Sequence, residues 1–142
     1  MSSPSLFIDT GAFFARYVTS DQYHHQAMQL WNKVREEKYK CITTNAVTIE
    51  FINLLLRKAK PSESLQIAKE IYHSHLLKVE PLTSEQELSA LDWLQRFGDQ
   101  RFSMTDATSF AFMEEHKITN AFTFDHHFEI AGFKKFTLSV SK

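Results

Sequence analysis

Cysteine is nearly absent from this chain, since Cys41 is the only one in 142 residues. A single thiol excludes an internal disulfide and any zinc site built from several cysteines. Cys41 stands between Lys40 and Ile42, a setting that favours a packed thiol. A chain without disulfides suits the reducing cytoplasm, where we expect this protein.

Long apolar runs are also missing. No segment approaches the roughly 20 consecutive apolar residues that a membrane-spanning helix needs, and residues 1–5 lack the basic and apolar regions of an export signal. We therefore expect no membrane association. Glycine and proline are scarce, with three of each, which excludes a collagen-like or low-complexity chain.

Charge of one sign is not in excess. Sixteen Lys and Arg stand against 17 Asp and Glu, for a net charge of −1, and this argues against a protein that coats nucleic acid through a broad basic surface. A nuclease is not excluded. Acids that bind metal in a catalytic pocket are counted in the same sum, and basic groups elsewhere remain available for phosphates.

What the chain does contain is the pattern of one α/β domain spanning residues 1–142. Short apolar segments, bounded by turn residues, alternate with segments whose apolar residues recur at helical spacing. This alternation predicts a mostly parallel central sheet. The helix over 46–58 is apolar almost all round, so we expect it to be buried. The sequence predicts strands over 6–8, 41–44, 76–79 and 121–124, an edge strand over 136–138, and helices over 12–18, 21–35, 46–58, 61–71, 83–97 and 105–116.

Four acids stand where such a fold would gather them. Open parallel sheets bind ligands outside the carboxyl ends of their strands. Asp9 follows the first predicted strand, Asp125 follows the fourth, and Asp106 lies in the first turn of a helix. Glu50 lies one turn into the most apolar helix, between Ile49 and Phe51, where a lone carboxylate would carry a steep desolvation cost.

Each acid also has an ordinary structural explanation. Asp9 could cap a helix, and Asp106 could complete a capping box with Ser103. Asp125 could be a turn residue. Glu50 could reach solvent or pair with Arg57 or Lys58 on the same helix, although both lie two turns away, beyond the usual i+4 partner. Taken alone, the capping box is the better explanation of Asp106, whereas the structural explanation of Glu50 is the weakest of the four.

The combination of the four acids favours a metal site. Carboxylates gathered at one sheet edge repel one another unless some are protonated or a cation binds them. Oxygen ligands select hard ions, here Mg²⁺ or Mn²⁺, which serve phosphodiester hydrolysis. We expect Asp9, Glu50 and Asp106 to hold the principal ion, and Asp125 to bind a second ion or to orient the attacking water. Polar neighbours suited to support these ligands are Thr10, Ser103, Thr105 and Thr123.

The segments that carry these acids resemble those of the PIN-domain nucleases, and within them the VapC-like toxins. The matching segments lie in the family's order along nearly the whole chain. Each is short and weakly specific alone, and their combination at these separations is the stronger evidence. They are residues 7–10 (Phe-Ile-Asp-Thr), 44–50 (Thr-Asn-Ala-Val-Thr-Ile-Glu), 102–107 (Phe-Ser-Met-Thr-Asp-Ala), 121–128 (Ala-Phe-Thr-Phe-Asp-His-His-Phe) and 131–133 (Ala-Gly-Phe).

The resemblance implies a three-layer α/β/α fold and an Mg²⁺- or Mn²⁺-dependent endoribonuclease. It also implies a toxin of a type II toxin–antitoxin pair, with RNA as substrate, an antitoxin protein as partner and a homodimeric assembly. The family's acidic positions fall on Asp9, Glu50, Asp106 and Asp125, while Asp99 is interpreted as a peripheral loop residue. The alternatives are a solitary RNA-processing nuclease and a catalytically silent binding protein with the same fold.

A haloacid-dehalogenase-type phosphatase is a rival enzyme class, since it too begins from an Asp at the end of a first strand. That class requires a second Asp two residues later, where this chain has Gly11. We therefore rank it low.

The histidines and basic residues are less informative. Adjacent histidines on a helix point in different directions, so the pairs at 24–25 and 126–127 predict no transition-metal site, and neither do His73 and His75. His126 and His127 are kept as candidate phosphate or leaving-group contacts because they follow Asp125. Arg16 and Arg101 are candidate phosphate ligands, with ordinary surface charges as the alternative.

Overall fold

A computed structural model describes residues 4–138 of the chain. Strands and helices alternate along it, as the sequence pattern predicts. In chain order the elements are β1 (Ser5–Ile8), α1 (Thr10–Tyr17), α2 (His24–Glu36), β2 (Lys40–Thr44), α3 (Asn45–Lys58), α4 (Pro61–His73), β3 (Leu77–Glu80), α5 (Ser84–Arg96), α6 (Met104–Glu115), β4 (Asn120–Phe122), α7 (His127–Ile130) and β5 (Lys134–Lys135).

The strands form one sheet in the order β3-β2-β1-β4-β5, and every neighbouring pair is parallel. β1 is central: Leu6 lies opposite Cys41 of β2, and Phe7 lies opposite Ala121 of β4. The chain runs from β1 outward to β3 and then returns to β4 on the other side of β1. The strand order therefore reverses between β1 and β4, and the carboxyl ends of these strands are the expected ligand site of such a sheet.

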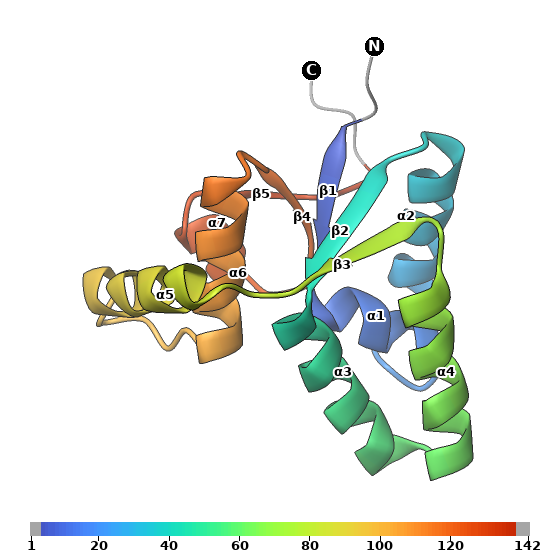
Figure 1. Cartoon of the computed structure of the whole chain (residues 1–142). Coiled ribbons are helices and arrows are strands. Elements are labelled where there is room, and N and C mark those ends of the chain that lie inside the picture. The colour runs from blue at the N-terminus through green and yellow to red at the C-terminus, as the bar shows by residue number, and fades with distance from the viewer. Residues whose placement is uncertain (1–3, 139–142) are drawn as a thin grey trace.

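Helices cover both faces of the sheet (Figure 1). α1 to α4 lie on one face, and α5, α6 and α7 lie on the other. α1 contacts both α2 and α3, α5 packs on α6, and α3 and α6 contact each other. This arrangement confirms the predicted three-layer α/β/α fold.

Phenylalanine forms much of the core. Phe7 of β1 lies 5.9 Å from Phe112 and 6.4 Å from Phe128, measured between ring centroids, and all three rings are fully buried. Burial of such a ring stabilises the fold by roughly 2–3 kcal/mol relative to an exposed one. Because Phe7 and Phe122 belong to the strands that flank the reversal, this packing fixes the strand ends from which the acids extend.

α3 differs from the prediction of a helix buried all round. Val47, Phe51 and Leu55 face the core, whereas the side chains of Ile49 and Leu56 are 53% and 47% exposed. The apolar residues follow the helical period on one face only, and the others lie on the surface.

From the sequence, Asn45 and Asp21 are the predicted N-caps of α3 and α2, and both predictions are wrong. Thr44 rather than Asn45 caps α3, since its side chain accepts a hydrogen bond from the backbone of Val47 at 3.5 Å. The Asn45 side chain instead accepts from the backbone N–H of Leu82 at 2.9 Å. Asp21 does not cap α2, which begins at His24. Its carboxylate accepts from the Tyr23 backbone and closes a turn that precedes the helix.

The edge strand lies at Lys134–Lys135 rather than at 136–138. Gly132 has a φ of 102°, a conformation open to glycine, and it turns the chain directly after α7. Pairing with β4 therefore begins earlier, at Lys134 opposite Asn120, and Phe136 follows as a buried residue. Within residues 4–138, no helix combines the length and apolar character that crossing a bilayer requires.

Candidate active site

The four predicted acids line one hollow of about 420 Å³, and Asp21 joins them. Asp9 and Asp125 follow the two strands at which the strand order reverses. Glu50 extends from α3 and Asp106 from α6, and these two helices contact each other. The structure thus brings together carboxylates from four separate segments of the chain, as the sequence interpretation requires.

Asp9 is the most enclosed of the acids. Its side chain makes no capping hydrogen bond at the start of α1, so the interpretation as a simple helix cap is wrong. Instead its carboxylate accepts a hydrogen bond from the Thr123 hydroxyl at 2.8 Å. Burial, together with the charges of Asp106 and Asp125, raises the pKa of Asp9 to about 7. Without a bound cation, the protein therefore stabilises the charged form of Asp9 poorly.

Two threonines surround Asp9. Thr123 links two of the acids, because its hydroxyl donates to Asp9 and accepts from the backbone N–H of Asp125 at 3.0 Å. Thr10 is 6% exposed and lines the hollow, and its hydroxyl has no hydrogen-bond partner among the described residues. A buried hydroxyl without a partner is costly unless a ligand or water engages it.

Asp106 belongs to the cap of α6 and also lines the acid hollow. Its carboxylate accepts from the Ser103 backbone at 3.1 Å, and the Ser103 hydroxyl accepts from the Asp106 backbone at 2.9 Å. This is a complete capping box at the start of α6. Burial also raises the pKa of Asp106, and the charge of Asp125 adds to the increase. The cap therefore holds Asp106 at the hollow rather than away from it.

Asp125 lies beside two histidines. One carboxylate oxygen accepts from the His127 backbone at 2.9 Å and lies 3.2 Å from the His127 Nδ1, which is itself 3.5 Å from a carboxylate oxygen of Asp106. That Nδ1 is buried and makes no hydrogen bond to any residue between 4 and 138. His127 therefore places a ring nitrogen between two of the acids.

The expectation that adjacent histidines diverge is wrong at 126–127. The two ring centroids are 4.5 Å apart, because His126 precedes α7 and only His127 belongs to it. One ligand atom each from Asp125, His126 and His127 falls within 4.8 Å of the others, the one such group of potential metal ligands in the described chain.

Glu50 is less enclosed than its apolar neighbours predict. It is half-buried at the rim of the hollow, so the expected steep desolvation cost does not apply. It also lines an adjoining hollow together with Arg57 and Thr105. Arg57 lies two turns along α3 from Glu50, on the same side of the helix, and the sequence analysis considered it only as an ion-pair partner.

The two predicted phosphate-binding arginines lie outside this hollow. The Arg16 guanidinium lies over the Trp31 ring, 4.9 Å from its centroid, and it also lies over Tyr17. Arg101 is exposed, as is Asp99 in its loop. His126, by contrast, does line the hollow.

Apolar side chains form the rest of the lining, and the sequence analysis assigned none of them to the site. Tyr23 and Phe124 stack with their centroids 4.6 Å apart and their ring planes 4° from parallel. They come from remote segments, so no local pattern predicts their contact. The apolar lining residues are Phe14, Tyr23, Leu54 and Phe124.

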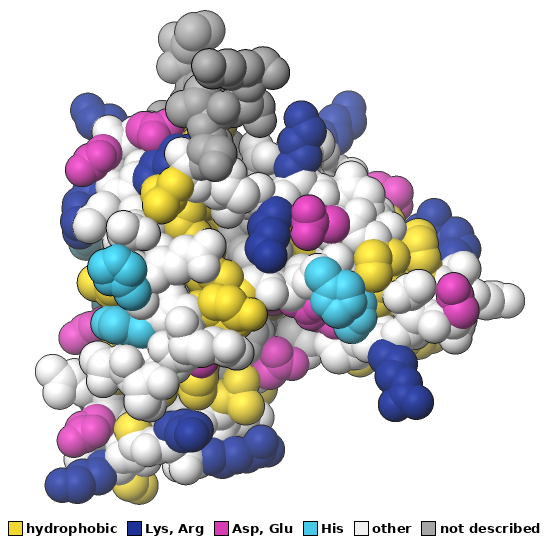
Figure 2. All heavy atoms as spheres, turned by 180° about the vertical axis from the view of Figure 1, so that it is seen from behind, with side chains coloured by type: hydrophobic (Ala, Val, Ile, Leu, Met, Phe, Trp, Pro, Cys, Tyr) yellow, Lys and Arg dark blue, Asp and Glu magenta, His cyan; other side chains and the backbone are white. Residues whose placement is uncertain are grey.

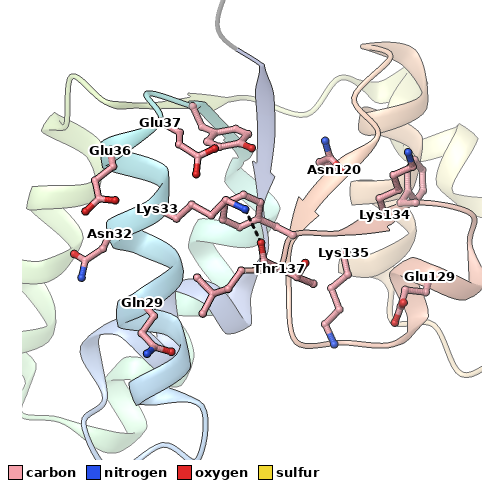
Figure 3. A pocket seen from close by; sticks show the side chains of 14 residues that line it. Gln29, Asn32, Lys33, Glu36, Glu37, Asn120, Glu129, Lys134, Lys135 and Thr137 are labelled. Atoms are coloured by element: carbon pink, nitrogen blue, oxygen red, sulfur yellow. Dashed lines mark hydrogen bonds between the residues drawn. The ribbon is translucent and has the colours of Figure 1, made fainter. Parts of the chain in front are cut away.

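A larger hollow of about 990 Å³ lies elsewhere, between α2 and the β4–β5 edge (Figure 3). It contains none of the four acids. Lys33 crosses it and donates a hydrogen bond to the carbonyl oxygen of Thr137 at 2.8 Å, and both acidic and basic side chains line it. On the face shown in Figure 2, Lys and Arg are likewise dispersed among acids rather than gathered in one patch.

Known proteins share both the sequence and this architecture. The family model described as PIN domain matches residues 6–134. The 23S rRNA-specific endonuclease VapC20 of Mycobacterium tuberculosis is 34% identical over 128 residues, covering 90% of this chain and 95% of that protein. The crystal structure of VapC20, described as a sarcin-ricin loop cleaving toxin, superposes with a TM-score of 0.83 at 35% identity, over 91% of this chain and 96% of that one.

More distant structures share the fold. FitAB bound to a DNA fragment gives a TM-score of 0.68 at 11% identity, over 96% of this chain and 98% of that chain. FitAcB from Neisseria gonorrhoeae gives 0.65 at 12%, over 93% and 96%. Together with the matched domain and the similarity to VapC20, the geometry leads to one conclusion: this chain belongs to the PIN domain family.

Proposed function

We propose that this protein is a divalent-metal-dependent endoribonuclease that hydrolyses RNA phosphodiester bonds. The observation that carries the proposal is the meeting of Asp9, Glu50, Asp106 and Asp125 in one hollow at the strand-order reversal. The similarity to VapC20, an rRNA-specific endonuclease, supports it. The activity is assigned to one domain that spans residues 1–142.

The chemistry of the hollow fits a hard divalent ion. Its acids offer oxygen ligands, which suit Mg²⁺ or Mn²⁺. Asp9 carries a pKa of about 7, so a nearby cation would stabilise the charged form that burial disfavours. The unpartnered hydroxyl of Thr10 supplies a further oxygen in the same place.

In this proposal Asp9, Glu50 and Asp106 hold the principal ion. When bound, the ion would activate a water molecule and neutralise negative charge on the scissile phosphate. Asp125 orients the attacking water or binds a second ion. Thr123 fixes the relative positions of Asp9 and Asp125 through its two hydrogen bonds.

Ser103 holds Asp106 through the capping box, and Thr105 lines the adjoining hollow next to Glu50. His126 is a candidate contact for a substrate phosphate because it lines the acid hollow. Arg57, at the adjoining hollow, is a better placed cation for this purpose than Arg16 or Arg101.

We further propose that the protein is the toxin of a type II toxin–antitoxin pair and acts as a homodimer in the cytoplasm. The description of VapC20 as a toxin supports the first part. Ile49 and Leu56, exposed on α3, supply apolar surface of the kind that protein partners cover. A solitary RNA-processing nuclease and a catalytically silent binding protein are the alternatives.

Cleavage assays test the proposal. The purified protein is incubated with a sarcin–ricin loop hairpin and with a single-stranded RNA, with Mg²⁺, with Mn²⁺ and with EDTA. We expect cleavage that requires the metal and falls at least about 100-fold in Asp9→Asn and in Asp106→Asn. Asp99→Asn, which changes an exposed loop acid, is the matched control and should cut like the parent.

Folded Asp9→Asn and Asp106→Asn variants that cut as fast as the parent would overturn the assignment. Cleavage of neither RNA by the parent would favour the silent binding protein. Thermal unfolding of each variant separates loss of chemistry from loss of fold.

A further inference from the structure

The acid hollow is poorly equipped to attract RNA through its phosphates. Five carboxylates line it, those of Asp9, Asp21, Glu50, Asp106 and Asp125, and none of the described residues in its lining is Lys or Arg. A bound metal would offset part of that charge, but it would act at the scissile phosphate. Within this hollow, the uncharged parts of the lining are therefore the main source of affinity for the neighbouring nucleotides.

The largest uncharged feature is the stacked pair of Tyr23 and Phe124. Their rings are parallel within 4° at a centroid distance of 4.6 Å, so they form one aromatic stack beside the acids. Phe124 is the inner ring: it is half-buried and packs edge-on against Phe122. Tyr23 is the outer ring and remains 38% exposed.

The pair is held in place before any ligand binds. The Tyr23 backbone N–H donates to the Asp21 carboxylate at 2.9 Å, and the next residue, His24, lies 2.7 Å through its Nδ1 from the carbonyl oxygen of Ala15. Phe124 lies between Thr123 and Asp125, whose hydrogen bond fixes the turn after β4. At Gly11, the position of a Cβ would already lie 3.7 Å from the Phe124 ring, so the start of α1 supports that ring closely.

We propose that the Tyr23–Phe124 pair is a binding site for an unpaired nucleobase of the RNA substrate, next to the bond that is cut. Every base has an aromatic face, and aromatic side chains stack on bases that RNA loops leave exposed. The pair therefore selects looped or single-stranded RNA over regular duplex. This inference rests on the proposed function, because it assigns the substrate contact of the same hollow.

The test compares Tyr23→Ala and Tyr23→Phe with the parent in cleavage of a loop-containing RNA. Tyr72→Ala is the matched control, since Tyr72 is also exposed, at 48%, but lies on α4 outside the hollow. We expect Tyr23→Ala to raise KM about tenfold or more while kcat changes less than about threefold. Tyr23→Phe and Tyr72→Ala should both stay within about twofold of the parent, because stacking needs the ring and not the hydroxyl.

A second readout does not depend on cleavage. Asp9→Asn protein, alone and combined with Tyr23→Ala, is titrated into RNA that carries 2-aminopurine at successive loop positions. Stacking on Tyr23 should change the fluorescence at one loop position, and the change should disappear with Tyr23→Ala. A folded Tyr23→Ala variant with the parent's KM, or an equal loss in Tyr23→Phe and Tyr23→Ala, would overturn the inference.

The two proposals fail in different ways. If the parent cuts RNA and Tyr23→Ala does so with unchanged KM, the nuclease assignment stands and the base site is wrong. If the parent cuts no RNA, the nuclease assignment is wrong. The fluorescence titration then decides the base site by itself: the Tyr23-dependent signal supports it, and the absence of that signal refutes it.

Discussion

Asp9 shows most clearly how one residue links the fold to the chemistry. It follows β1 directly, and its backbone N–H donates to the carbonyl oxygen of Phe122 at 3.0 Å, so the sheet fixes its position. That position buries the carboxylate, and its pKa is raised to about 7. Such a position suits a metal ligand, because a bound ion would stabilise the buried charge and raise the free energy of unfolding above that of the metal-free protein.

This predicts a pH dependence of the metal-free protein. Asp9 has a pKa near 3.8 when unfolded and about 7 when folded, so the folded state binds more protons between these values. The free energy of unfolding should therefore fall as the pH rises from about 4 to about 7, and stay low above it. Asp9→Asn removes this pH-dependent fall in the free energy of unfolding, while the Thr123 hydroxyl can still donate to the amide oxygen. At pH 8 in EDTA the variant should be more stable than the parent, on the order of 2 kcal/mol.

Urea unfolding of the parent and of Asp9→Asn across that pH range measures the effect. Parallel curves for the two proteins would show that Asp9 is not the source of the pH dependence. Asp99→Asn serves as the control, because Asp99 is exposed.

Among the secondary-structure elements, α6 links helix capping to the site most directly, because its first turn holds Asp106. Ser103 and Asp106 form a capping box there, and Thr83 and Gln86 form the same motif at the start of α5. The two motifs have the same hydrogen-bond pattern, and only that of α6 lies at the acid hollow. The pair of helices therefore offers an internal control for the role of the cap.

Removing the cap hydroxyl tests this difference. Ser103→Ala and Thr83→Ala should each lower the free energy of unfolding by about 1 kcal/mol, because each loses one hydrogen bond to a helix N–H. Only Ser103→Ala should also slow RNA cleavage, by about tenfold, since its cap positions Asp106. Chemical unfolding and cleavage rates, measured on the same preparations, give both numbers. Equal activity of the two variants would mean that the cap does not position Asp106.

Sequence patterns predicted most elements but not their ends. Helices with a clear apolar period, such as α5 and α6, begin within one or two residues of the expected position. α7 has a single turn and carries too little periodicity to be recognised, and the edge strand shifted to Lys134–Lys135 because Gly132 turns the chain early. Local patterns do not contain the pairing register, which depends on the neighbouring strand.

The site was predictable to the extent that it follows from topology. Asp9, Asp106 and Asp125 stand at strand ends or a helix start, and such positions converge in a parallel sheet. The partial exposure of Glu50 was not predictable, because it depends on which neighbours α3 meets. The contact of Tyr23 with Phe124 joins remote segments and leaves no local signal at all.

At the scale of the whole molecule, positive and negative charges nearly balance, with 16 Lys and Arg against 17 Asp and Glu. The net charge is −1, and the face in Figure 2 has no continuous basic patch. RNA recognition should therefore depend on few phosphate contacts and more on base contacts in the hollow. This differs from proteins that bind nucleic acid mainly by releasing counterions.

Salt dependence of RNA binding measures this difference. With the inactive Asp9→Asn protein, the plot of log affinity against log salt concentration should have a slope of magnitude below about 3. Arg57→Ala should reduce that magnitude by about one if Arg57 contacts a phosphate, and Arg101→Ala should leave it unchanged. A slope of magnitude about 6 or more would indicate a broad basic interface and contradict this view.

The central claim is that carboxylates from remote parts of the chain share one hard cation. Mn²⁺ binding, followed by electron paramagnetic resonance of the free ion, tests it directly on the parent and on Asp9→Asn, Glu50→Gln and Asp106→Asn. We predict that the parent binds Mn²⁺, that each substitution weakens binding at least about tenfold, and that Asp99→Asn binds like the parent. If Asp9→Asn and Asp106→Asn remain folded and bind Mn²⁺ as tightly as the parent, the account is wrong.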